Sequence, residues 1–188
     1  DKAHAAYRLG AKFQSSYYGL LSAQALGRGF DPRLTTPDAP DWKGAPFLTS
    51  SVYTAGIALL EAGDLSLGER FLTHLVETLP PDEALQLGQM AVDREQPHLA
   101  VMISKRAAQD GLELAGAYYP LHPVTQMSLP MASEMVLAIA RRESEFDPVV
   151  ISHVGARGLM QVMPATAELV ARELDILDDH KTARLTEN

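Results

Sequence analysis

The hydrophobic and polar positions of this 188-residue chain follow a helical rather than a strand period in nearly every window that can be interpreted. Glycine and proline mark the ends of the apolar stretches: Gly27 and Gly111 each close a predicted helix, and Pro80-Pro81 interrupts the pattern. Asp82 is placed to cap the helix that follows. The pattern predicts helices over residues 5–9, 15–26, 50–62, 65–78, 83–92, 96–108, 130–145 and 165–174. We therefore expect an all-α protein.

The four central helices form two hairpins of similar layout. Their turns lie near Gly63 and Gln96, about 33 residues apart, which is the repeat length of tetratricopeptide-like solenoids. Small residues would allow the paired helices to approach closely, namely Ala55, Gly56, Ala62 and Gly68. Two units do not establish a repeat, and an irregular helical bundle would give a similar pattern. The spacing favours a helical-hairpin solenoid.

Two segments interrupt the helical pattern. Residues 29–44 contain three prolines and predict an irregular connection. The run from Tyr118 to Pro123 cannot be regular helix, because each of its prolines lacks a backbone donor and restricts the residue before it. We place the domain junction here. The predicted organisation is a helical solenoid and linker domain over residues 1–117, followed by a second domain over residues 118–188.

Composition excludes several classes of function. With 46% hydrophobic and 21% charged residues the chain can form a real core, so it is not a disordered protein. The absence of cysteine rules out thiol catalysis and cysteine-based metal sites, and the six histidines have no metal-ligand spacing. A net charge of -8 argues against nucleic-acid binding. No run approaches the roughly 20 apolar residues of a membrane helix. We expect no metal ion and no cofactor.

Glu143 is the first candidate for chemistry. Stepping back along the predicted helix from Glu143, the same face carries only apolar residues: Ala140, Ile139, Val136 and Ala132. A carboxyl at the end of an apolar stripe and near a helix C-terminus would lose solvation and favour its protonated form, as a general acid requires. Alternatively, Glu143 reaches solvent and pairs with Arg142 or Arg157. Helical geometry alone leaves both possibilities open.

A glycine-bearing turn follows that helix. Phe146-Asp147-Pro148 ends the helix, and Gly155 and Gly158 permit positive φ or close backbone approach. The turn presents three further candidates: Met160, Gln161 and Met163. The amide of Gln161 offers both a donor and an acceptor, which suits a sugar N-acetyl group. The methionines could form an adaptable wall for a sugar face, or they could simply pack in the core.

Two elements of this region together resemble the soluble lytic transglycosylase family. They are Arg142-Glu143-Ser144-Glu145-Phe146-Asp147-Pro148 and Gly155-Ala156-Arg157-Gly158-Leu159-Met160-Gln161-Val162-Met163-Pro164-Ala165-Thr166-Ala167, which stand in family order and at family-like spacing. The segments 16–20 and 118–121 resemble the α-superhelical domains of the same enzymes more loosely. The resemblance implies an all-α fold in which a superhelical solenoid segment precedes the N-terminal part of a lysozyme-like α domain.

The resemblance also implies an activity and roles for particular residues. The activity is cleavage of the β-1,4 bond between N-acetylmuramic acid and N-acetylglucosamine in peptidoglycan, leaving 1,6-anhydromuramic ends. Glu143 matches the single acid/base. Ser152, nine residues later, matches a position that contacts the N-acetyl group, and Gln161 and Met163 match pocket residues. Met160 and Ser144 are added to this substrate-binding set, although Ser144 is better suited to holding the helix end than to touching sugar.

The implied partners are peptidoglycan glycan strands, and the implied location is the periplasm of the bacterial cell envelope. A hydrolytic carboxylate pair must also be considered, because Glu145 and Asp147 lie close to Glu143. Glu145 would diverge from Glu143, since it lies roughly 200° around a continuing helix. Asp147, before Pro148, is better explained as a turn residue. The single-carboxylate reaction is therefore the favoured interpretation.

The chain departs from the family pattern after Met163, where nothing resembles the Ala-Tyr-Asn element and late Tyr that complete the family groove. The chain also begins at Asp1 without an initiator Met or signal segment, as a processed or truncated product would. We expect it to cover only the opening part of a catalytic domain and to be inactive alone. The alternative is a non-catalytic helical scaffold that binds peptidoglycan or other cell-wall proteins.

Overall fold

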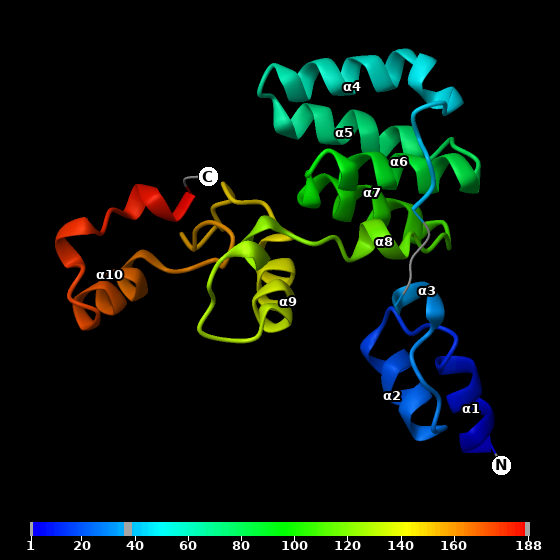
Figure 1. Cartoon of the computed structure of the whole chain (residues 1–188), viewed down its shortest axis with the longest axis horizontal. Coiled ribbons are helices and arrows are strands. Elements are labelled where there is room, and N and C mark those ends of the chain that lie inside the picture. Colours follow the sequence, from blue (N-terminus) through cyan, green and yellow to red (C-terminus); the bar gives the residue numbers. More distant parts are fainter. Residues whose placement is uncertain (1, 36–38, 187–188) are drawn as a thin grey trace.

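The computed structural model of the protein describes residues 2–35 and 39–186, and Figure 1 shows helices joined by loops. Extended pairing in these ranges is limited to two isolated bridges, Ile151 with Arg157 and Arg157 with Val162. The all-α prediction is confirmed. The α-helices are α1 Lys2–Gly10, α2 Tyr17–Ala25, α3 Pro32–Thr35, α4 Ser51–Glu61, α5 Leu65–Val76, α6 Pro81–Asp93, α7 Pro97–Gln109, α8 Ala115–Tyr118, α9 Ser133–Ser144 and α10 Pro164–Glu173. The 3-10 turns are η1 Pro46–Thr49, η2 Pro123–Gln126, η3 Leu177–Asp179 and η4 Thr182–Thr186.

Helices α4 to α7 form two hairpins that stack on one another, with α8 beneath them (Figure 1). This is the predicted solenoid segment. Its core contains fully buried side chains from α5, α6, α7 and the N-cap of α8, namely Leu72, Leu87, Met90, Ile103 and Leu114. The first hairpin needs glycine where its helices cross, because a Cβ on Gly68 would lie 2.5 Å from Leu60 Cδ2. The predicted close approach therefore holds for Gly68, whereas Ala62 is an exposed C-cap residue.

Helices α1 to α3 lie beyond α8, away from the α4–α5 hairpin (Figure 1). Polar contacts connect them to the solenoid: the Ser15 hydroxyl donates to the Glu113 carboxylate over 2.7 Å, and the Tyr119 hydroxyl donates to the Ser15 carbonyl over 2.8 Å. Trp42, in the long connection from α3 to α4, packs against the solenoid core and donates through Nε1 to Asp93. The N-terminal helices are thus attached to residues at both ends of α8.

Several predicted boundaries are wrong. Helix α6 begins at Pro81 with Pro80 as its N-cap, so Asp82 lies in the first turn; proline tolerates the first helical position because no amide donor is needed there. Helix α9 begins at Ser133 and not at residue 130, because Ala132 has extended backbone with ψ 131°. The short helix α3 also occurs in the segment 29–44 that was expected to be irregular, although Pro37 lies outside the described residues. The short helix α8 ends at Tyr118, where the second irregular segment was predicted to begin.

A second, smaller core positions the C-terminal region. It contains Val101, Ala140 and Phe146, with Leu159 and Met160 packed against them. Val101 belongs to α7 of the solenoid, Ala140 to α9, and Leu159 and Met160 to the glycine-bearing turn. The solenoid therefore supplies part of the surface on which α9 and the turn are assembled.

Candidate active site

Glu143 lies on the exposed side of α9, one residue before the helix ends. The buried face of this helix is formed by Val136, Ala140 and Ser144, which follow an i, i+4 spacing. Glu143 is adjacent to that face but outside it, so its predicted desolvation is wrong. Within residues 2–35 and 39–186, Glu143 also does not form the predicted alternative, an ion pair with Arg142 or Arg157.

The end of α9 has an unusual backbone. Glu145 and Phe146 take left-handed conformations with φ 55° and 67°, which non-glycine residues rarely adopt. The Phe146 side chain is buried in the second core and stacks on His122, with ring centroids 5.4 Å apart, and these contacts offset the strain of the left-handed backbone. Burial in turn lowers the pKa of His122 below its ordinary value. Two consecutive left-handed residues turn the chain sharply away from Glu143.

The other two acidic groups near Glu143 are engaged elsewhere. The Glu145 carboxylate forms an ion pair with Lys105 Nζ on α7. Asp147 Oδ1 accepts a hydrogen bond from the Val149 amide over 2.9 Å, as expected for a turn residue. Of the three carboxylates at this end of α9, Glu143 is the one left in solvent without a partner.

The turn after α9 is closed by its own backbone and side chains. Arg157 and Val162 exchange two amide–carbonyl hydrogen bonds of 3.0 Å each, and the Gly158 amide donates to the Val150 carbonyl over 2.9 Å. Ser152 contributes from the other side, because its Oγ accepts a 2.9 Å hydrogen bond from the Ala156 amide. This segment is short, yet its backbone polar groups are paired internally as in a small sheet.

Ser144 connects the two sequence elements. Its side chain is buried, and its hydroxyl lies 2.8 Å from the Leu159 carbonyl and 3.0 Å from the Ala140 carbonyl, so it can donate to either. The residue next to Glu143 is therefore bonded to the turn that carries Met160 and Gln161. The structural role suggested for Ser144 in the sequence agrees with this position inside the protein.

The remaining predicted site residues occupy different positions on the turn. Gln161 has φ 47° and uses its amide nitrogen to donate to the Val150 and Gly158 carbonyls, over 3.2 and 3.0 Å. Met163 is exposed at the N-cap of α10, whereas Met160 packs in the second core. The structure thus joins Ser144, Met160 and Gln161 into one assembly and leaves Met163 at the surface.

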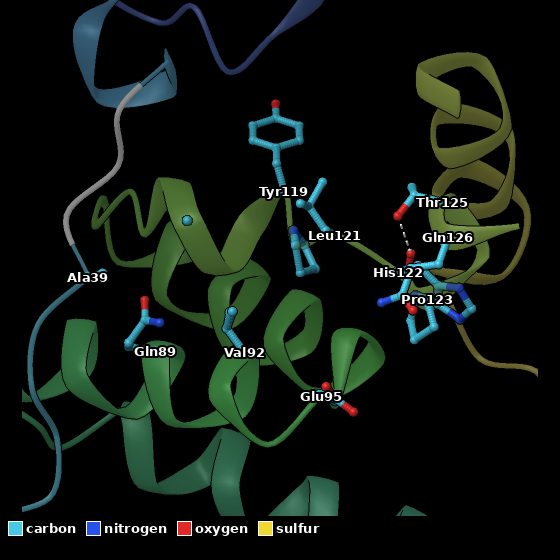
Figure 2. A pocket seen from close by; sticks show the side chains of 12 residues that line it. Ala39, Gln89, Val92, Glu95, Tyr119, Leu121, His122, Pro123, Thr125 and Gln126 are labelled. Atoms are coloured by element: carbon cyan, nitrogen blue, oxygen red, sulfur yellow. Dashed lines mark hydrogen bonds between the residues drawn. The ribbon is translucent and has the colours of Figure 1, made fainter. Parts of the chain in front are cut away.

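Figure 2 shows a separate cavity of about 460 Å³ between the solenoid and the junction. Its lining includes Glu95, Tyr119 and His122, and contains none of the predicted site residues. In the described part of the chain no three His, Asp or Glu side chains gather to hold a metal ion, and no helix is long and apolar enough to cross a membrane.

Comparisons with known proteins agree with the two sequence elements. The family model of the transglycosylase SLT domain matches residues 127–186, which include α9, the turn and α10. A Haemophilus influenzae protein named as a soluble lytic murein transglycosylase is 29% identical over 162 residues, which cover 84% of this chain and 27% of that protein. Residues 127–186 thus match the SLT domain model, and the chain as a whole is similar to soluble lytic transglycosylases.

Two solved structures share the fold. The 70-kDa soluble lytic transglycosylase from Escherichia coli aligns with a TM-score of 0.70 and 22% identity over 97% of this chain and 30% of its own. An inactive variant of the lytic transglycosylase Slt from Pseudomonas aeruginosa aligns with a TM-score of 0.63 and 22% identity over the same shares. This chain spans about a quarter of the length of the curated relatives that it matches.

One contact beside the candidate site was not found from the sequence. Arg141 on α9 places its guanidinium over the rings of Tyr118 and Tyr119, 4.4 and 4.9 Å from their centroids, and donates from Nε to the Tyr118 carbonyl. A cation over two aromatic faces fixes α9 against the junction. The paired tyrosines before Pro120 were a visible signal, but no local pattern connects them to a residue more than twenty positions away.

Proposed function

We propose that this chain provides the solenoid edge and the opening part of the catalytic domain of a peptidoglycan lytic transglycosylase, with the domains dividing near residue 118. The enzyme would cleave the β-1,4 bond between N-acetylmuramic acid and N-acetylglucosamine and leave 1,6-anhydromuramic ends. One observation carries the proposal. Glu143 presents a free carboxyl on a helix end whose next residue, Ser144, is bonded to the turn that contains Gln161.

In this reaction Glu143 acts twice. It first donates a proton to the leaving glycosidic oxygen, and its carboxylate then takes a proton from the C6 hydroxyl of the muramic residue, whose oxygen bonds to C1. The substrate's own N-acetyl oxygen stabilises the positive anomeric carbon between these steps. A second protein carboxylate is not needed, which agrees with the engagement of Glu145 by Lys105 and of Asp147 by Val149.

The exposure of Glu143 supports the proposal that the chain is inactive alone. General acids and developing charges work best where water is excluded, and in this structure nothing covers the Glu143 carboxyl. The glycan strand itself, and further protein from the full-length gene product, would supply that cover. We therefore expect turnover from the full-length protein and none from residues 1–188.

Three surface groups are proposed to bind the glycan. Ser152 Oγ accepts from Ala156, which leaves its hydroxyl proton available for an N-acetyl carbonyl. Gln161 uses its amide nitrogen within the turn and can accept through its amide oxygen. Met163 offers an exposed apolar contact for a sugar face. Met160 and Ser144 act from the interior, by holding this surface in place.

The test is a digest of purified peptidoglycan with the full-length gene product, followed by mass analysis of the released muropeptides. We expect soluble muropeptides with anhydro ends, one water lighter than hydrolysis products, in a bacterial envelope enzyme that acts in the periplasm. Binding of glycan strands without release would instead support a non-catalytic scaffold that binds peptidoglycan or other cell-wall proteins, and would refute the enzymatic proposal.

A further inference from the structure

The end of α9 is held from the solenoid by two residues of α7. The Glu145 carboxylate pairs with Lys105 Nζ, and the Glu145 carbonyl accepts a 2.9 Å hydrogen bond from His98 Nδ1. The carboxylate and the backbone carbonyl of Glu145 are therefore both bonded to α7. Glu145 is also the residue at which the backbone becomes left-handed. Glu145 lies two residues after Glu143, a separation of about 3 Å along a helix axis.

His98 is part of a chain of contacts across three elements. Its Nε2 lies 3.0 Å from Glu69 Oε2 on α5, while its Nδ1 faces the Glu145 carbonyl at the end of α9. A carbonyl and an ionised carboxylate can only accept hydrogen bonds, so both ring nitrogens must carry a proton to satisfy both contacts. The geometry thus requires the imidazolium form of His98 for the complete arrangement.

The electrostatic surroundings favour that form. Burial alone would lower the pKa of His98, but the Glu69 carboxylate, the Glu145 carbonyl and the nearby negative charge of Asp147 together raise the pKa above its ordinary value. The charged groups around the ring are Glu69 from α5, Glu145 and Asp147 after α9, and Lys105 on α7 itself, which is paired with Glu145.

The contacts lie on one side of α7. Positions 98, 101 and 105 share a helix face, and all three contact the C-terminal region: His98 and Lys105 bind Glu145, and Val101 packs with Ala140 and Phe146. A polar contact thus lies on each side of an apolar one. This arrangement resists both sliding and rotation of the end of α9.

Building on the function proposed for Glu143, we propose that His98 and Lys105 are positioning residues, which act through Glu145 to fix the end of α9 and hence the Glu143 carboxyl from the solenoid side. The superhelical domain then does more than bind or enclose glycan, because it sets the geometry of the catalytic acid. When His98 loses its proton, one of its two hydrogen bonds is lost and this support weakens.

The sign of the pH dependence follows from the raised pKa of His98. The protonated ring is favoured in the folded protein, so its contribution is fully present below the ordinary histidine value of about 6.5. It is lost as the pH rises through the higher value of the folded state. A Glu69→Gln change removes the main group that raises the pKa, and should shift this loss to lower pH.

The proposal is tested with the full-length gene product by steady-state muropeptide release. Lys105→Met and His98→Gln should each lower kcat about tenfold while KM changes less than about twofold, because the acid is misplaced but glycan binding is intact. Lys105→Arg retains the charge and should restore most of kcat. His74→Gln is the matched control, since His74 pairs with Glu77 on the exposed side of α5 and should leave kcat unchanged.

A second readout follows His98 itself. Exchange of its ring C2 hydrogen, measured by mass spectrometry against pH, gives its pKa, and Glu69→Gln should lower that pKa and the alkaline limb of kcat together. The proposal is overturned if Lys105→Met and His98→Gln both keep the kcat of the unsubstituted enzyme while Glu143→Gln is inactive.

If Glu143→Gln is instead fully active, the proposed function fails, and the positioning role of His98 and Lys105 is judged by the rate of amide hydrogen exchange at residues 143–146. Faster exchange in Lys105→Met than in Lys105→Arg would support it, and equal exchange would overturn it.

Discussion

Glu143→Gln in the full-length gene product is expected to reduce muropeptide release about a thousandfold. Glutamine keeps the size and shape of the side chain but can neither donate the proton needed by the leaving oxygen nor accept one from the C6 hydroxyl. Loss of a general acid or base costs about 10²–10⁴ in rate, and the expected loss lies in the middle of that range. The measurement is the initial rate of release from purified peptidoglycan.

The matched control is Glu134→Gln, which makes the same change in the exposed first turn of the same helix, α9. It should retain essentially full activity and the same thermal stability as the unsubstituted protein. If Glu143→Gln keeps more than about half of the activity, the assignment of the acid is wrong. A comparable loss in Glu134→Gln would indicate that α9 is merely sensitive to changes in charge.

Gly158→Ala is expected to have the largest effect on stability. Gly158 has φ 69°, and a Cβ at this position would lie 1.7 Å from the Leu185 carbonyl oxygen in η4. A methyl group cannot occupy that space, so η4 must move away from the turn. The displacement of η4 and the strain of a left-handed alanine should together lower the free energy of unfolding by about 3 kcal/mol or more. Urea unfolding of the chain measures this loss.

Gly155→Ala separates the two causes. Gly155 also has positive φ, at 92°, but nothing lies within 4 Å of the position where its Cβ would be. This change should cost only the backbone strain, about 1–2 kcal/mol. Limited proteolysis should also release the η4 segment earlier in Gly158→Ala than in Gly155→Ala. Equal effects in the two variants would show that contact with Leu185 does not stabilise the turn.

Local signals predicted the helices well because periodicity and chain breakers are local properties. The α4–α5 and α6–α7 hairpins follow from apolar spacing and from the turns near residues 63 and 96, and Gly68 follows from the need for close packing. The starts of α6 and α9 were less certain, because several residues near each start can serve as the first position. Tertiary contacts decide among them.

The burial of Glu143 was predicted incorrectly for a specific reason. The apolar residues before it fit a stripe that ends at either residue 143 or residue 144, and the choice depends on where the packing partners lie. Val101 from α7 and Leu159 from the turn place Ala140 and Ser144 inside. A rotation of one residue around the helix moved Glu143 outward, and no pattern within α9 reveals that rotation.

Contacts between distant residues were also beyond the sequence. Lys105 and Glu145 are 40 positions apart, and the approach of Gly158 to Leu185 joins segments on either side of α10. The glycine pattern showed that positive φ was permitted, but not what would fill the adjacent space. The sequence elements suggested the chemistry that we propose, whereas the contacts of α7 with the end of α9 become visible only in the structure.

The source of the oxygen atom at the new glycan ends tests the proposed reaction most directly. It shows whether Glu143 cleaves the glycosidic bond without adding water. Purified peptidoglycan is digested by the full-length gene product in water enriched in ¹⁸O, and the muropeptide masses are measured at early times. Transglycosylation through Glu143 predicts anhydro ends that are one water lighter and contain no ¹⁸O. Reducing ends that carry one ¹⁸O each would show hydrolysis and contradict the proposed reaction.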